Sequence, residues 1–190
     1  MELLLTRELT HSKTVNRISG VTVFVILMSL GAFVRIPLPF SPVPLTLQTF
    51  FVLLSGACLA GNLGMFSQLA YISLGMAGLP LFTAAAGSGL LYLLGPTGGY
   101  LFGFILAALF IGRLLKYNAR GASSVFIVFC LADFILLSCG ALWLKFISGC
   151  SFTQAVFMGF LPFIPGDLLK AAAAAVVYSR IHKRCREIFQ

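Results

Sequence analysis

Two charged residues stand three positions apart in an apolar stretch near the end of this 190-residue chain. They are Asp167 and Lys170, within PGDLLKAAAAAVVY. Residues three apart lie on the same face of a helix, so the carboxylate and the ammonium can point into one space. A charge inside a membrane helix costs about 2.5–3.5 kcal/mol on insertion scales and marks a functional site by default. The pair therefore predicts a site for a ligand that carries both N–H donors and carbonyl or carboxylate acceptors.

Two structural interpretations of these charges stay open. Asp167 follows Pro165 at the start of an apolar run, where a carboxylate can accept backbone N–H bonds and cap a helix. Lys170 can instead form an ion pair with Asp133 of the preceding run. Counting back from Arg180 at 1.5 Å per residue puts Lys170 about 15 Å from the cytoplasmic boundary, near the middle of the bilayer.

The composition indicates a protein that lies in a membrane. Hydrophobic residues make up 59% of the chain and charged residues only 9%, and the mean hydropathy is +1.03. A soluble domain carries about 25% charged residues. The chain therefore lacks the polar surface of a water-soluble globule, and its length allows one membrane bundle without a separate soluble domain.

The apolar runs predict an all-α bundle of six membrane-spanning helices, each near the required length of about 20 residues. The expected spans are residues 18–36, 45–60, 63–79, 99–115, 122–144 and 166–181. A short re-entrant or interfacial helix is expected before the last span. The chain then divides into a basic N-terminus (1–17), one membrane domain (18–183) and a basic C-terminal tail (184–190).

The distribution of basic residues predicts the orientation. Ten of the thirteen Lys and Arg residues fall in three clusters, near the N-terminus, between the fourth and fifth spans, and near the C-terminus. With six spans these clusters share one side, which the positive-inside rule makes cytoplasmic. We therefore expect a multi-pass protein of the cytoplasmic membrane with both termini inside. The net charge of +8 then reflects topology and contact with headgroups rather than nucleic-acid binding.

The longest expected loops face outward and carry motifs. PLPFSPVPLTLQ holds four prolines in eight residues, which favours stiff, extended backbone. This segment is either a simple connector or a wall over a pocket. Thr46 and Gln48 follow at the outer start of the second span, where they can direct hydrogen-bonding groups inward.

GPTGGY, residues 95–100, is the second outward motif. Its glycines permit close backbone approach, and they continue into a stripe of small residues spaced by four, ending at Gly103 and Ala107. Close helix packing explains Gly103 and Ala107. It explains Thr97 and Tyr100 less well, so these two are candidate binding residues.

Several function classes find no support in the chain. It contains no G-x-x-x-x-G-K-[ST] motif for nucleotide binding and no Ser/His or paired-carboxylate constellation inside the spans, so we expect no enzyme. The five cysteines form no C-x-x-C pair, and both histidines lie in the basic flanks. No metal or cofactor is expected.

Four motifs occurring in order resemble a known family. They are RIPLPFSPVPLTLQTFFVLLSG, LGMAGLPLF, GPTGGYLFGF and LPFIPGDLLKA, spanning about Arg35 to Ala172. Together they are similar to the BioY family, the biotin-specific substrate-binding (S) subunits of energy-coupling-factor (ECF) transporters. The combination is highly specific, although each motif alone is weak.

The resemblance implies a six-helix bundle that binds biotin near the outer face, with a transmembrane coupling subunit and cytoplasmic ATPase subunits as partners. The implied ligand-binding residues are Asp167, Lys170, Thr97, Gly98, Tyr100, Thr46, Gln48 and Phe82. The implied partner contact on the first span is Met28, Ser29 and Ala32. The alternative is a self-sufficient secondary transporter of a small organic acid or vitamin, with Asp167, Lys170 and Asp133 as a proton relay.

Overall fold

The structure is a computed structural model that describes residues 2–59, 61–82, 89–118 and 121–189. Its longer helices are α1 (Glu2–Phe33), α2 (Gln48–Leu59), α3 (Leu63–Met76), α5 (Gly98–Asn118), α6 (Ala122–Ser148) and α8 (Ile164–Phe189). Its shorter ones are α4 (Leu90–Leu94), α7 (Phe152–Gly159) and the 3-10 turn η2 (Leu161–Phe163). The predicted all-α bundle of six helices, with a short helix before the last, is confirmed.

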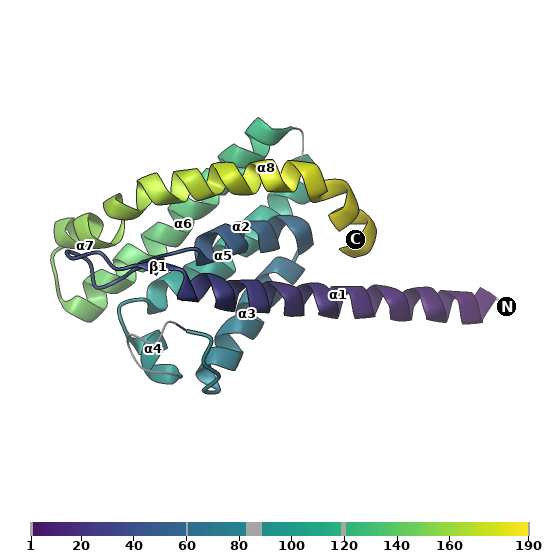
Figure 1. Ribbon diagram of the computed structural model, residues 1–190, viewed down its shortest axis with the longest axis horizontal. Helices are drawn as coiled ribbons and strands as arrows, with labels where there is room; N and C mark the ends of the chain where they lie inside the picture. The colour runs from purple at the N-terminus through teal and green to yellow at the C-terminus, as the bar shows by residue number, and fades with distance from the viewer. Residues whose placement is uncertain (1, 60, 83–88, 119–120, 190) are drawn as a thin grey trace.

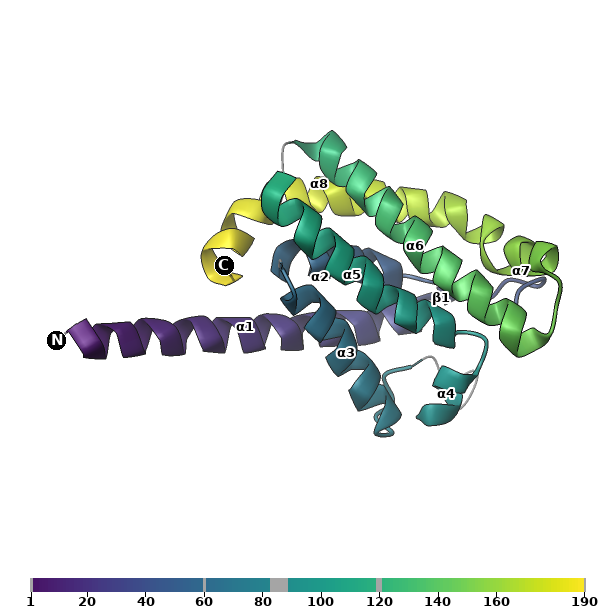
Figure 2. The same ribbon diagram turned by 180° about the vertical axis from the view of Figure 1, so that it is seen from behind.

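Helices α1 and α8 follow the long axis of the molecule, and α3 crosses α1 obliquely, so that α3 ends and α4 lies beyond α1 in this view (Figure 1). Both ends of the chain lie at the same end of the bundle, and α1 projects beyond it. At the opposite end lie β1, α4 and α7, as the reverse view also shows (Figure 2). The segments that carry the predicted binding motifs are therefore gathered away from the termini.

The helices differ in length. Among the described residues, four segments are long and apolar enough to cross a membrane, and they contain most of α1, α5, α6 and α8. Helices α2 and α3 are apolar but have 12 and 14 residues, about 18 and 21 Å at 1.5 Å per residue, against a hydrocarbon core of about 30 Å. The second span was expected at 45–60, but α2 begins only at Gln48. Ala60, the last residue of the expected span, lies outside the described residues.

A small hairpin explains the late start of α2. Strand β1 (Arg35–Ile36) pairs antiparallel with β2 (Leu45–Thr46), with Arg35 opposite Thr46. Prolines at 42 and 44 favour extended backbone in the residues before them, and the pairing keeps the chain extended until Thr46. The hairpin folds the proline-rich loop back on itself and fixes Thr46 beside the end of α1.

Small residues allow α5 to pack directly against α6. A Cβ added to Gly103 would lie 2.9 Å from both the Cα and the carbonyl oxygen of Leu136, so no larger side chain fits there. Ala107, one turn further, is fully buried. The packing interpretation of this stripe is therefore confirmed, and the same helix carries Tyr100 in its first turn, with Thr97 directly before it.

The first helix presents a different face from the one expected to meet a partner. Met28 and Ala32 have 0% exposed surface and pack inside the bundle, and the Ser29 hydroxyl donates to the Val25 carbonyl. The proposed contact at Met28 and Ala32 is therefore corrected, because these side chains already contact their own chain. The exposed stripe of α1 is formed by Val23, Ile26, Leu30 and Phe33.

Candidate functional site

The charged pair of α8 joins with one residue of α2. The Lys170 ammonium lies 2.8 Å from Asp167 Oδ1 and donates to Thr49 Oγ1 at 2.9 Å. The Thr49 hydroxyl in turn donates to Asp167 Oδ1 at 3.1 Å. The Asp167 side chain is 3% exposed and that of Lys170 is 12% exposed. The three groups form a closed polar triangle inside an apolar bundle.

This triangle decides between the earlier interpretations. Asp167 lies in the first turn of α8, but the hydrogen bonds to its Oδ1 come from side chains and not from the backbone of the helix start. Lys170 pairs with Asp167 and not with Asp133. Within the described part of the chain, Asp167 Oδ2 is buried without a hydrogen-bond partner. That oxygen is therefore an acceptor available to a ligand.

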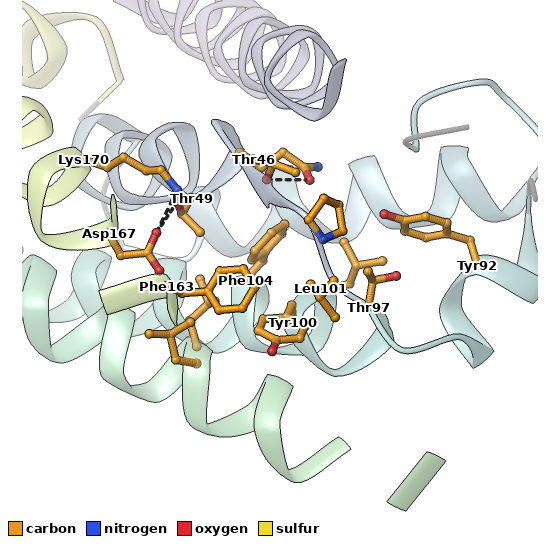
Figure 3. Close-up of a pocket in the computed structure, with 15 residues that line it drawn as sticks. Thr46, Thr49, Tyr92, Thr97, Tyr100, Leu101, Phe104, Phe163, Asp167 and Lys170 are labelled. Carbon is orange, nitrogen blue, oxygen red and sulfur yellow. Dashed lines mark hydrogen bonds and ion pairs between the residues drawn. The ribbon is translucent and has the colours of Figure 1, made fainter. Parts of the chain in front are cut away.

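The triangle lies at one end of a cavity. Figure 3 shows the side chains of Asp167, Lys170 and Thr49 close together at one end. Tyr92 and Thr97 lie toward the other end, and aromatic rings lie between the two groups. The cavity is lined by Val43, Pro44, Thr46, Gln48, Thr49, Tyr92, Thr97, Tyr100, Leu101, Phe104, Leu136, Leu137, Phe163, Asp167 and Lys170. It is a slot with polar groups at both ends and an apolar middle.

Most of the residues predicted from the sequence meet at this cavity. Six of the eight candidates line it, from α2, α5, α8 and the segments before them. The proline-rich loop contributes Val43 and Pro44, as a wall over a pocket would. The Thr97 hydroxyl oxygen is buried and has no hydrogen-bond partner among the described residues, so it can serve a ligand.

Phe82 and Gly98 are the two candidates that do not line the cavity. Phe82 lies behind it, because its ring stacks on the cavity residue Tyr92 with centroids 4.6 Å apart and planes at 13°. Gly98 is buried against Leu93 and Trp143, and a Cβ there would collide with the Leu93 carbonyl. Both residues support the wall of the cavity in this structure, and a direct contact with ligand stays a prediction.

Sequence reasoning missed Thr49, Tyr92, Phe104 and Phe163. Thr49 carried a usable signal, since it directly follows Gln48 and is a polar residue in an apolar helix. Its buried position, 8% exposed, matches a hydrogen-bonding role. The two phenylalanines carried no such signal, because the chain has nineteen and most belong to lipid-facing or core positions.

Tyr100 is held from two sides. Its hydroxyl donates to the Gly159 carbonyl of α7, and its ring lies flat against Gly140 of α6, where a Cβ would overlap the ring. The absence of a side chain at Gly140 therefore sets the position of this cavity residue.

Gly140→Ala should consequently destabilise the protein and weaken ligand binding together. Overpacking of this kind costs about 1–3 kcal/mol, and the displaced ring would intrude on the cavity. Thermal unfolding in detergent should record a lower midpoint than the parent. Leu142→Ala, at an exposed position of the same helix, is the control and should change the midpoint little. An unchanged midpoint for Gly140→Ala would contradict the packing described here.

A second cavity lies behind Asp167, between α6 and the start of α8. Asp133 lines it together with Asp167, and aromatic walls come from Phe134 and Phe160, whose rings meet edge to face at 5.6 Å. Asp133 is 5% exposed, and neither of its carboxylate oxygens has a hydrogen-bond partner among the described residues.

With this geometry in place, comparison with known proteins identifies the family. A model of the BioY family matches residues 6–187, nearly the whole chain. The chain belongs to the BioY family. The match covers the proline-rich loop, the GPTGGY segment and the α8 pair, so the cavity is built from the part of the chain that the BioY family model describes.

Individual members of the BioY family are similar over most of their length. The chain is 39% identical over 172 residues to a probable biotin transporter BioY of Lysinibacillus sphaericus, covering 86% of this chain and 85% of the relative. It is 39% identical over 168 residues to the biotin transporter BioY of Thermotoga maritima, covering 85% and 92%. A crystal structure of the S-component for biotin from an ECF-type ABC transporter matches with a TM-score of 0.83 at 28% identity, covering 93% and 97%.

Proposed function

We propose that this chain captures biotin in the cavity as the substrate-binding component of an ECF-type transporter, and performs no covalent chemistry. The observation that carries the proposal is the triangle of Asp167, Lys170 and Thr49 at one end of an apolar slot, in a chain of the BioY family.

The chemistry of the cavity fits the parts of biotin. Its ureido ring has two N–H donors and one carbonyl, which suit Asp167 Oδ2 and an N–H of Lys170. Its sulfur-containing ring and aliphatic tail suit the apolar middle, where Phe104 and Phe163 lie. Its carboxylate needs donors, and the Thr97 hydroxyl at the far end supplies one. Polar groups left unpaired by a wrong ligand provide the selectivity.

Calorimetry on the purified chain tests this proposal. Biotin should bind, and desthiobiotin, which retains the ureido ring, should bind as well. Lipoate, which has a sulfur ring and a carboxylate tail but no ureido group, should not compete. Binding of lipoate with the affinity of biotin would contradict the assignment of the α8 pair to the ureido ring.

A coupling subunit and cytoplasmic ATPases are the proposed partners, because the chain contains no nucleotide-binding motif of its own. The exposed stripe of α1, with Val23, Ile26 and Leu30 at 50–58% exposure, is the candidate contact on the first helix. The rival function is a proton-coupled secondary transporter, favoured by the buried carboxylate of Asp133.

We further propose that both termini are cytoplasmic and that the cavity opens outward. The basic clusters and the shared end of the two termini support this orientation. Cysteines at Ser41 and Ser88, in a background without the five native cysteines, should react with an impermeant thiol reagent added to intact cells. A cysteine at Asn118 should react only after permeabilisation. Labelling of position 118 from outside would reverse the orientation. Position 88 lies outside the described residues.

A further inference from the structure

A fully buried tyrosine connects the cavity to the chain after α3. Tyr71 is 0% exposed and lies on α3, and its hydroxyl donates to the Leu81 carbonyl at 3.0 Å. Gln48 of α2, which lines the cavity, donates from Nε2 to the same hydroxyl at 2.8 Å. Tyr71 itself does not line the cavity, so its effect on a ligand passes through Gln48.

The proton count at Tyr71 fixes the orientation of the Gln48 amide. A hydroxyl has one proton, and a backbone carbonyl can only accept, so the contact with Leu81 uses that proton. The remaining contact of the hydroxyl must then be as an acceptor. Gln48 therefore contacts the Tyr71 hydroxyl through Nε2. The alternative orientation, with the amide oxygen and nitrogen exchanged, is excluded because it would place two acceptors in contact.

The opposite end of the amide is consequently an acceptor. Gln48 Oε1 accepts a hydrogen bond from the Thr46 hydroxyl at 3.3 Å, and Thr46 also lines the cavity. A carbonyl oxygen has two lone pairs, so one stays available for a ligand group. A ligand carboxylate would be repelled here, whereas an N–H would be bound.

Aromatic packing keeps the tyrosine in place. The Phe82 ring meets the Tyr71 ring edge to face, with centroids 5.5 Å apart, and its tip fills the space left by Gly75. Phe82 also stacks on Tyr92 of the cavity wall. The ring of Tyr71 therefore stays fixed when the hydroxyl is removed, and the hydroxyl can be tested by itself.

We propose that Tyr71 is a positioning residue that orients the Gln48 carbonyl oxygen toward the cavity and so selects a ligand N–H donor. The proposal rests on biotin being the ligand, whose N–H donors belong to its ureido ring. It assigns that ring to the region between Gln48 and Asp167. Without the Tyr71 hydroxyl, the Gln48 amide can rotate by half a turn. Its NH2 group would then face the N–H donor of the ligand, and the hydrogen bond would be lost.

The test compares biotin with an analogue methylated on both ureido nitrogens, by calorimetry or competition. Tyr71→Phe should weaken biotin binding about fivefold, the effect of one lost hydrogen bond, and leave the weaker binding of the analogue unchanged. Discrimination between the two ligands should therefore fall by the same factor. Tyr178→Phe, at another buried tyrosine away from both cavities, is the matched control and should keep the parental discrimination.

A double-mutant cycle separates positioning from general damage. In a Gln48→Leu background, Tyr71→Phe should change biotin affinity less than about twofold, because its effect passes through an amide that is no longer present. An additive loss in that background, or an equal loss for both ligands, would overturn the proposal. If Tyr71→Phe does not fold, Gln48→Leu tests the proposal by itself. Unchanged discrimination between biotin and the methylated analogue in Gln48→Leu would also overturn the proposal. A parent that fails to bind biotin would instead contradict the proposed function.

Discussion

Replacing Asp167 with asparagine should weaken biotin binding at least tenfold, a loss of about 1.4 kcal/mol. The substitution keeps the volume of the side chain but removes the charge that balances Lys170 at 2.8 Å. It also turns one of two acceptor oxygens into a donor, so either the Oδ1 acceptor shared by Lys170 and Thr49 or the free Oδ2 acceptor is lost. Breaking one half of a buried pair leaves the other charge unsatisfied, which adds to the effect.

Lys170→Met should weaken biotin binding by a similar factor and leave the bundle folded. Methionine is unbranched and about as long as the apolar stem of lysine, so we expect the packing of α8 to be preserved while the donor to the ligand disappears. Lys145→Met is the matched control, because Lys145 lies over the Phe146 ring in the last turn of α6 and does not line either cavity. Calorimetry should give parental affinity for the control. Parental affinity for both Asp167→Asn and Lys170→Met would make the pair structural and the assigned site wrong.

The sequence predicted the bundle and the polar pair because both depend on rules that act locally. An apolar run of about 20 residues must be helical in lipid, since every backbone group needs an internal partner. A charge within such a run stands out against its neighbours, and the spacing of Asp167 and Lys170 on one helix face needs no tertiary information. The same local logic identified Gln48 at the start of α2 and Thr46 just before it.

The partner of the pair could not be predicted in this way. Thr49 meets Lys170 only because α2 crosses α8 at that level, and residues 49 and 170 are separated by 121 positions in the sequence. Tyr71 was overlooked for the same reason, since a tyrosine in an apolar helix suits packing equally well. Its role depends on contacts with Gln48 and Leu81 that only the fold creates.

The error on α1 has a physical cause as well. Small and flexible side chains such as Ala32 and Met28 permit close approach, but they do so for helices of the same chain and for a partner alike. In a membrane, hydropathy cannot distinguish a core face from an outer face, because lipid is as apolar as the protein interior. The structure assigns both residues to the core, with 0% exposure.

Biotin uptake should require partner subunits, with no accumulation by this chain alone. The chain offers a binding cavity, and its sequence contains no G-x-x-x-x-G-K-[ST] motif, so we expect the use of ATP to depend on a partner. In vesicles that hold this protein only, internal biotin should rise no higher than the bound amount. This should hold with ATP, and it should hold with an imposed proton gradient. Adding a coupling subunit and two ATPases should then produce accumulation that depends on ATP.

The rival interpretation makes the opposite prediction, and Asp133 separates the two. A proton-coupled transporter needs a buried group that gains and loses a proton, and in the rival interpretation that group is Asp133, a buried carboxylate beside the site. Accumulation driven by the gradient alone, and abolished by Asp133→Asn, would establish the secondary transporter. If accumulation follows ATP and partner subunits, Asp133→Asn should leave it largely intact, because Asp133 does not line the ligand cavity. The comparison of parent and Asp133→Asn in both kinds of vesicle therefore decides which energy source the bundle uses.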